Sequence, residues 1–289
     1  MSYQSIFSAG LFKDQVVIVT GGGSGIGRCT AHELSALGAS VALVGRKLDK
    51  LEKVAAEITQ QGGTVSLHTC DIREEAQVQD TVAAVLRQHG RIDGLVNNAG
   101  GQFAAPLAQI NARGWDAVVR TNLTGGFLMA RECYTQWMQS AGGGIVNIVA
   151  DMWMGMPGMA HSGAARAGMI NFTETAALEW APVRLNAVAP GWIASSGMDN
   201  YPPQMASMIQ SIHTLVPLRR LGTESEVSAA IVFLLSPAAA FISGACLRVD
   251  GAAPNAKRIW PQVGTGQQPP EFNGFHLAER PSVLKPGSS

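Results

Sequence analysis

Short apolar runs alternate with longer amphipathic stretches along most of the chain. Seven runs are rich in β-branched residues and have the composition of strands buried on both faces: 15–20, 40–45, 64–70, 93–98, 144–150, 183–190 and 246–251. Stretches with helical periodicity lie between them, at 25–37, 47–61, 73–89, 112–139, 160–180 and 224–236. This order predicts an α/β fold: one doubly wound, Rossmann-type parallel sheet of seven strands with helices on both faces.

The regular pattern ends near residue 252. Residues 253–289 are rich in Pro, Gly and Gln, with the isolated aromatics Trp260, Phe272 and Phe275. We therefore expect one domain over 1–252 and a C-terminal tail over 253–289. The aromatics of the tail either dock on the domain or a neighbouring subunit, or belong to a frayed end.

Composition excludes several classes of protein. The chain has 289 residues, of which 46% are hydrophobic and 15% charged, enough to bury a large core. A formal net charge of zero argues against nucleic acid or an anionic membrane as partner. Four scattered cysteines without a CxxC pair indicate a reducing compartment, and six histidines without HExxH spacing argue against a metal site. With no leader or membrane-length apolar run, we expect a cytoplasmic protein without a metal.

The segment "TGGGSGIGR" (20–28) directly follows the first predicted strand and opens a helix. Gly21, Gly25 and Gly27 lack the Cβ atoms that would block a tight turn and the close approach of a pyrophosphate. The N–H groups at the start of the helix favour such an anion. We expect this turn, with Ser24 and Ile26, to bind a dinucleotide.

The end of the second predicted strand indicates which dinucleotide. It reads "VGRK", so Gly45 stands where a carboxylate would bind the adenosine ribose, and Arg46 and Lys47 follow it. Positive charge at this place suits a 2′-phosphate. NADP(H) is the expected cofactor, with NAD(H) possible; the alternative is that these residues form only a solvated basic start of a helix.

Four motifs, "TGGGSGIG", "NNAG", "TNLTG" and "APGWI", resemble those of the short-chain dehydrogenase/reductase family over about residues 12–252. The resemblance implies an NAD(P)-dependent oxidoreductase that forms a homotetramer. Apolar residues beyond one core-facing stripe on the helices at 112–139 and 160–180 also suit subunit contacts. The resemblance further implies cofactor contacts from Asp71, Ile72, Asn98, Gly100, Pro190, Gly191 and Ile193.

The same resemblance exposes departures at the catalytic positions. Asn122 of "TNLTG" matches, but the family's serine falls at Val149 or Ala150, its tyrosine at Ser162 and its lysine at Arg166. A serine hydroxyl is a poor acid and Arg166 keeps its proton, so carbonyl reduction would lose about 10²- to 10⁴-fold in rate.

Conjugate reduction of an unsaturated thioester makes a weaker demand. The developing enolate needs a hydrogen-bond donor at the thioester oxygen, worth roughly 3 kcal/mol, more than it needs a strong acid. Ser162 is a candidate for that donor. Arg166 would bind the ribose of the nicotinamide and keep positive charge beneath the cofactor.

A narrower resemblance agrees with this chemistry. "NNAGGQF", "GGIVNIV" and "HSGAARAGMINFTETAALEW" resemble the branch of peroxisomal trans-2-enoyl-CoA and 2,4-dienoyl-CoA reductases, which draw their proton donor from elsewhere. One donor position of that branch is Ile170 here, so it does not carry over. Asp151 matches the dienoyl reductases' tyrosine and is the candidate proton donor, or else a loop or helix-cap carboxylate. His161 is a second candidate, but it should point about 100° away from Ser162 on a helix.

We therefore carry three hypotheses. The first is NADP(H)-dependent reduction of the C=C bond of an apolar enoyl-CoA-type substrate. The second is an NAD(P)-dependent alcohol or aldehyde dehydrogenase for acyclic terpenoids, because the chain also resembles bacterial citronellol/citronellal dehydrogenases. The third is a protein that binds the cofactor without turnover. The methionine-rich loop at 152–160 either lines an apolar pocket for the substrate or is packing filler, and the segment at 195–217 is expected to form a lid.

Overall fold

The computed structural model describes residues 2–201, 203–255 and 268–285. Its strands are β1 (Val16–Thr20), β2 (Ser40–Gly45), β3 (Thr64–Thr69), β4 (Gly94–Asn97), β5 (Gly144–Ile148), β6 (Arg184–Pro190) and β7 (Cys246–Val249). All pair in parallel in the order β3-β2-β1-β4-β5-β6-β7. The predicted single doubly wound sheet of seven strands is confirmed.

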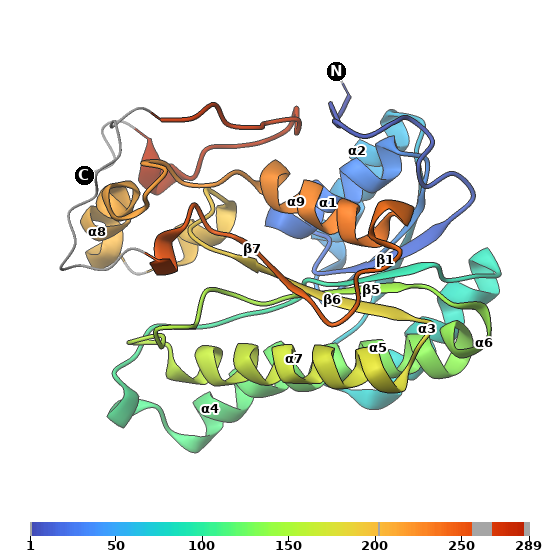
Figure 1. Ribbon diagram of the computed structural model, residues 1–289, viewed down its shortest axis with the longest axis horizontal. Coiled ribbons are helices and arrows are strands. Elements are labelled where there is room, and N and C mark those ends of the chain that lie inside the picture. Colours follow the sequence, from blue (N-terminus) through green and yellow to red (C-terminus); the bar gives the residue numbers. More distant parts are fainter. Residues whose placement is uncertain (1, 202, 256–267, 286–289) are drawn as a thin grey trace.

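Helices cover both faces of this sheet (Figure 1). On one face lie α1 (Gly25–Ala36), α2 (Leu48–Gln60) and α9 (Glu224–Leu235); on the other lie α3 (Glu75–His89), α4 (Ala112–Val119), α5 (Gly125–Cys133), α6 (Gln139–Ala141) and α7 (Ala160–Glu179). The short α8 (Ala206–Ser211) lies apart from both layers, within the expected lid segment. Two apolar clusters, one under each layer of helices, form the core.

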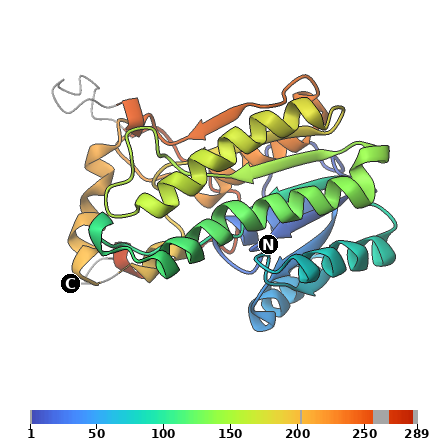
Figure 2. The ribbon, with the colours of Figure 1, turned by 90° about the horizontal axis from the view of Figure 1, so that it is seen from below.

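The helix predicted over 112–139 is interrupted twice. Figure 2 shows it running between α3 and α7, and two π-helical segments, η2 (Arg120–Thr124) and η3 (Tyr134–Met138), join α4, α5 and α6. Hydrophobic periodicity does not reveal such segments, since a π-turn shifts the register by one residue without changing which residues are apolar. The first of them carries Asn122.

A buried polar chain links the strands beneath the site to α7. Asn97 Nδ2 on β4 donates to Asn147 Oδ1 on β5 at 2.9 Å, and Asn147 Nδ2 donates to Thr173 Oγ1 on α7 at 2.8 Å. Buried amides need such partners, and the bonds fix α7 against the sheet. The residues at the start of α7 are thereby held at the carboxyl edge of β4 and β5.

The described part of the C-terminal segment packs on the domain. Phe275 is buried against Tyr3 and Cys29, and the backbone N–H of Gln4 donates to Gly274 O at 2.8 Å. Phe272 offers its carbonyl to Thr223 Oγ1 at 2.6 Å. Trp260, the third aromatic of the tail, lies outside the described residues.

Two features of the described residues bear on the expected class of protein. None of their helices is both long and apolar enough to span a membrane. No group of three or more His, Cys, Asp or Glu side chains within them is placed to hold a metal ion.

Candidate active site

The glycine-rich turn occupies the crevice between β1 and β4, where the strand order reverses. Gly21 and Gly25 have φ of +66° and +57°, which L side chains rarely adopt. A Cβ on Gly27 would lie 2.4 Å from Asn98 Nδ2 and 2.5 Å from Gly21 O, so only glycine fits there. The turn therefore has the open backbone that the sequence predicts.

The first turn of α1 is free to accept an anion. Ser24 is its N-cap residue but makes no side-chain capping bond, and no acidic residue lies in the first turn. Ile26 packs against the core and anchors the turn from below. The N–H groups at this end of the 12-residue helix are placed for a pyrophosphate.

Asn98 ties the ends of β1 and β4 together. Its Nδ2 donates to Thr20 O at 3.0 Å, while Thr20 Oγ1 accepts from the backbone N–H groups of Asn98 and Ala99, each at 3.0 Å. These bonds hold the glycine-rich turn against the loop that follows β4. Asn98 thus supports the turn, and Gly100 lies farther along the same loop.

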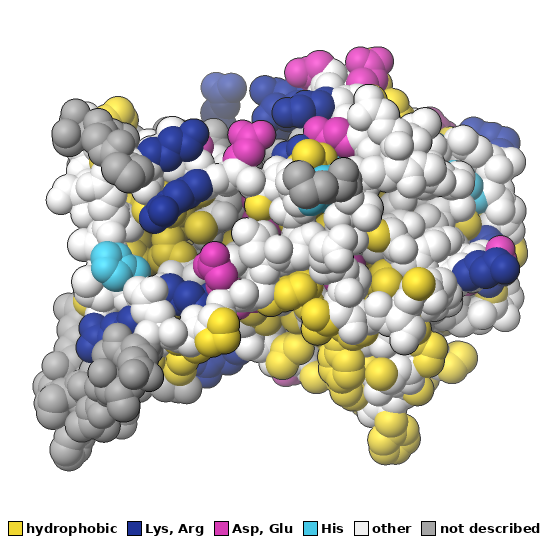
Figure 3. All heavy atoms as spheres, turned by 90° about the horizontal axis from the view of Figure 1, so that it is seen from above, with side chains coloured by type: hydrophobic (Ala, Val, Ile, Leu, Met, Phe, Trp, Pro, Cys, Tyr) yellow, Lys and Arg dark blue, Asp and Glu magenta, His cyan; other side chains and the backbone are white. Residues whose placement is uncertain are grey.

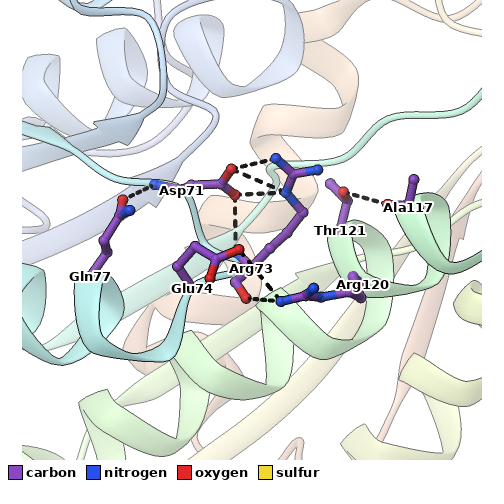
Figure 4. A network of polar contacts seen from close by, with 7 residues as sticks. All are labelled: Asp71, Arg73, Glu74, Gln77, Ala117, Arg120 and Thr121. Carbon is purple, nitrogen blue, oxygen red and sulfur yellow. Dashed lines mark hydrogen bonds and ion pairs between the residues drawn. The ribbon is translucent and has the colours of Figure 1, made fainter. Parts of the chain in front are cut away.

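At the adenosine end, Arg46 and Lys47 are exposed directly after β2. Asp71, which the family resemblance assigns to the adenine, is bound by Arg73 (Figure 4). Hydrogen bonds from Arg73 hold the Asp71 pKa below its ordinary value, and the charge of Arg46 lowers it further. Ile72 is buried beside Asp71. Because Arg73 neutralises the carboxylate, positive charge dominates this end of the crevice.

Asn122 is buried in the π-helical segment η2 and faces the loop after β4. Its Oδ1 accepts from the Gly101 N–H and its Nδ2 donates to Gly101 O, both at 2.9 Å. This exchange fixes the backbone of Gly100 and Gly101 beside α7.

Arg166 reaches the same loop from α7. A Cβ on Gly100 would lie 2.6 Å from Arg166 Nη2, and Arg166 Nη1 donates to the carbonyl of Ile148. Its Nε is buried without a partner, and no carboxylate of the described residues pairs with the guanidinium. Burial lowers the Arg166 pKa to about 10, so the side chain stays cationic at neutral pH.

Ser162 lies one turn before Arg166 and is fully buried. Its Oγ donates to Gln102 Oε1 at 2.7 Å, so its proton is already used. His161 packs edge-on against the ring of Phe103, and its Nδ1 accepts from the Ser162 N–H at 2.9 Å. Asn122, Arg166 and Ser162 thus contact one loop, at Gly100 to Gln102, and His161 contacts the next residue of that loop, Phe103.

Asp151 lies in the loop after β5 and faces a second acidic residue. Burial raises the Asp151 pKa, and the charge of Asp250 raises it further against the opposing effect of Arg248. Arg248 binds Asp250 at 2.7 Å and lies over the ring of Trp153. This raised pKa suits a carboxyl that must hold a proton.

The residues at the end of β6 and after it form another wall of the candidate site. Pro190 ends the strand and is buried, and a Cβ on Gly191 would lie 2.8 Å from Asp250 Cα. Ile193 is buried and forms a bridge with Gly222. A cavity of about 400 Å³ beside Ile193 is lined partly by Trp192, Val216 and Leu218. The apolar part of this wall is suited to a hydrophobic ligand.

A larger cavity, of about 630 Å³, lies between the lid segment and the C-terminal segment. His213, Arg219, Arg220 and Arg280 line it together with Glu224, Glu271 and Glu279. Figure 3 shows basic and hydrophobic side chains together on the α8 side of the molecule.

These residues fit an NAD(P) cofactor. The glycine cradle has no room for a Cβ at Gly27, and the partly exposed Arg166 has a buried, unpaired Nε. A cation without a counter-ion is costly in a folded protein, and ribose hydroxyls or a phosphate beside it would offset that cost.

Three further residues of the site are not evident from sequence patterns: Gln102, Tyr201 and Glu224. Gln102 Nε2 donates to Tyr201 Oη at 3.0 Å, and Glu224 lies beside Gly25, whose Cβ would be 3.8 Å from its Oε1. "NNAGGQF" contains Gln102, but no spacing in the sequence links it to a tyrosine 99 residues later.

Glu224 should make cofactor affinity depend on pH. Burial raises its pKa to about 7, the nearby Arg28 opposes this, and Glu279 adds to it. Below pH 7 the carboxyl is neutral; above it a negative charge faces the pyrophosphate site. We expect the NADP(H) Kd of the wild type, divided by that of Glu224→Gln, to rise as pH goes from 6 to 8. Fluorescence titration measures this ratio, and exposed Glu179→Gln is the control. A ratio independent of pH would contradict the prediction.

Comparison with known proteins places these features in a family. A family model described as enoyl-(acyl carrier protein) reductase matches residues 21–252. A probable 2,4-dienoyl-CoA reductase of Bacillus subtilis is 36% identical over 245 residues, 83% of this chain and 96% of that protein. A peroxisomal 2,4-dienoyl-CoA reductase of Danio rerio is 34% identical over 256 residues, 87% of this chain and 85% of that protein.

A solved structure is more similar in sequence. The citronellol catabolism dehydrogenase of Pseudomonas aeruginosa PAO1 is 61% identical, with a TM-score of 0.79, covering 87% of this chain and 99% of that one.

Proposed function

The chain belongs to the short-chain dehydrogenase/reductase family, and we propose that it is an NADP(H)-dependent oxidoreductase that reduces the C=C bond of an apolar enoyl-CoA-type substrate. The observation that carries this proposal is the surroundings of Arg166. The side chains that gather around its loop are an asparagine and a serine whose proton is donated to Gln102. Neither of these two side chains is a strong acid that could protonate an alkoxide, which favours a reaction that forms a delocalised enolate.

The cofactor would be held by residues already described. The turn at Gly21, Gly25 and Gly27 and the start of α1 would hold the pyrophosphate, and Arg166 would hold the ribose of the nicotinamide. When bound, the reduced nicotinamide supplies a hydride. The protein must then provide a hydrogen-bond donor at the thioester oxygen and an acid for the carbon next to it.

We assign the acid to Asp151. Its O–H bond breaks as the electron pair of the enolate forms a C–H bond at the α-carbon, and the carboxylate then takes a proton from water. Its raised pKa keeps the proton available at a higher pH than an ordinary aspartate would. The apolar chain would occupy the cavity beside Ile193.

Asp151→Asn should lower kcat by about 10²- to 10⁴-fold with little change in KM, because general acid catalysis is lost and binding is not. The wild-type kcat should fall as pH rises through the raised Asp151 pKa, since only the protonated carboxyl donates. Steady-state assays across pH measure both effects, with exposed Asp116→Asn as the control. A variant that keeps the wild-type pH profile would exclude Asp151 as the acid.

NADPH oxidation with crotonyl-CoA and longer enoyl-CoA thioesters tests the reaction itself. We expect turnover of the thioesters, with saturated products by mass spectrometry, and little turnover of simple ketones. Activity confined to ketones or alcohols would refute the proposal.

A second candidate is an NAD(P)-dependent dehydrogenase of acyclic terpenoid alcohols or aldehydes. The 61% identity to a protein named as a citronellol catabolism dehydrogenase favours it. Turnover of citronellol or citronellal in place of the thioesters would select it. Tight cofactor binding without turnover of any of these would favour a binding protein.

We also propose a cytoplasmic homotetramer. Leu178 at the end of α7, Phe241, and Leu247 on the edge strand β7 expose large apolar side chains, which subunit contacts would cover. Light scattering of the purified chain measures the assembly.

A further inference from the structure

The proton of Ser162 is not available to a substrate. Its Oγ donates to Gln102 Oε1 at 2.7 Å, and a hydroxyl has only one proton. Ser162 is fully buried in the first turn of α7, whereas Gln102 is exposed, so this bond joins the buried helix face to the surface loop. Ser162 therefore orients Gln102 and does not bind the substrate oxygen as a donor.

The orientation of Gln102 determines that of a second hydroxyl. Because Gln102 Oε1 accepts from Ser162, its Nε2 is the donor that reaches Tyr201 Oη at 3.0 Å. Tyr201 accepts this bond, so its own proton points away from Gln102. No acceptor among the described residues takes that proton.

Tyr201 is held next to the candidate active site by elements far apart in sequence. Its ring packs on the apolar cluster of the lid segment, which contains Met198 and Ile209. Gln102 follows Gly101, the residue that Asn122 binds through both its backbone groups. The Tyr201 phenol is thus bonded to Gln102, the residue that directly follows the part of the loop contacted by Asn122 and Arg166.

We propose that Tyr201 is the hydrogen-bond donor to the carbonyl oxygen of the substrate as its enolate forms. Gln102, oriented by Ser162, is the positioning residue that turns the phenol proton toward that oxygen. A phenol is a stronger donor than an aliphatic hydroxyl, which suits a developing anion. The proposal deepens the proposed enoyl thioester reduction and rests on it for the nature of the substrate.

The donor role can be tested without turnover. Acetoacetyl-CoA ionises to an enolate that absorbs in the near ultraviolet, and with NADP⁺ present there is no hydride to reduce it. The wild type should lower the pH at which half of the bound thioester is enolate. Tyr201→Phe should reduce the enolate-to-keto ratio by about 10²-fold, the effect of one preorganised donor, and so raise that pH by about two units.

Gln102→Glu tests the orientation. A carboxylate accepts from both Ser162 and Tyr201, so it should draw the phenol proton away from the substrate and reduce enolate formation as Tyr201→Phe does. Tyr134→Phe is the matched control, because Tyr134 stacks on Trp180 with ring centroids 4.5 Å apart, away from the site. This variant should show the same enolate-to-keto ratio of the bound thioester as the wild type.

The outcomes separate the two proposals. If Tyr201→Phe stabilises the bound enolate as well as the wild type does, the donor assignment is wrong. This conclusion does not depend on which substrates the enzyme reduces. If Tyr201 proves necessary for the enolate but the wild type reduces no unsaturated thioester, the donor is supported and the proposed reaction fails. If the enolate-to-keto ratio falls in Tyr201→Phe but stays at the wild-type value in Gln102→Glu, the positioning role of Gln102 is wrong.

Discussion

Arg166→Met is expected to weaken NADP(H) binding by about 10²-fold, because one or two charge-assisted hydrogen bonds worth roughly 1.5–3 kcal/mol each are lost. Arg166 has a buried, unpaired Nε and lies against Gly100, at the edge of the glycine cradle. Its only hydrogen-bond partner within the described residues is the carbonyl of Ile148. The cation is therefore available to a ligand.

Stability should respond differently. No described carboxylate loses a partner when the guanidinium is removed, and the cost of an unpaired cation disappears, so the Tm of the ligand-free protein should not fall below that of the wild type. Fluorescence titration and thermal melts measure the two effects. Arg166→Lys, which keeps the charge but not the planar fork, should fall between wild type and Arg166→Met. Equal NADP(H) affinity in wild type and Arg166→Met would show that the cofactor does not reach this side chain.

The double variant Arg46→Ala, Lys47→Ala should lose about 10²-fold or more in NADPH affinity, because two charge-assisted contacts to the 2′-phosphate would be removed. Both side chains are exposed after β2, and the charge of Arg46 reaches Asp71 across the adenosine end of the crevice. NADH has no 2′-phosphate, so its affinity should change less than about threefold.

The ratio of the two Kd values is the informative quantity. Lys53→Ala, an exposed lysine farther along α2, controls for the general loss of positive charge. The loss of NADPH affinity should also shrink at high salt, as expected of exposed charges. An equal effect on NADPH and NADH would mean that these residues only solvate the start of the helix.

Strand and helix positions were predictable from the sequence to within two residues in most cases. Strands buried on both faces are continuous apolar runs, and their β-branched residues are bounded by the glycine turn and other breaks. The glycine turn was predictable too, because a missing Cβ is a property of the residue itself. The π-helical segment around Asn122 was not, since a change in backbone hydrogen bonding leaves the side-chain pattern intact.

The candidate site shows the same division. The sequence placed Asn122, Ser162 and Arg166 by their spacing along the family motifs, and the structure brings them to one loop. The sequence did not show which group accepts the hydrogen bond of the Ser162 hydroxyl. Its partner Gln102 lies 60 residues earlier in the chain, and the next partner in the chain of bonds, Tyr201, lies 99 residues after Gln102.

By itself, the amino-acid sequence determined the order of the elements, the glycine cradle and the basic pair after β2, because these depend on residue type and local spacing. Only the tertiary structure decided which side chains form hydrogen bonds and ion pairs with one another and which carboxyl pKa values are shifted. Asp71 is neutralised by Arg73, Asp151 faces Asp250, and the Ser162 proton is directed to Gln102. The physical reason is that hydrogen bonds and desolvation depend on distances of a few ångströms between segments, which no pattern along the chain specifies.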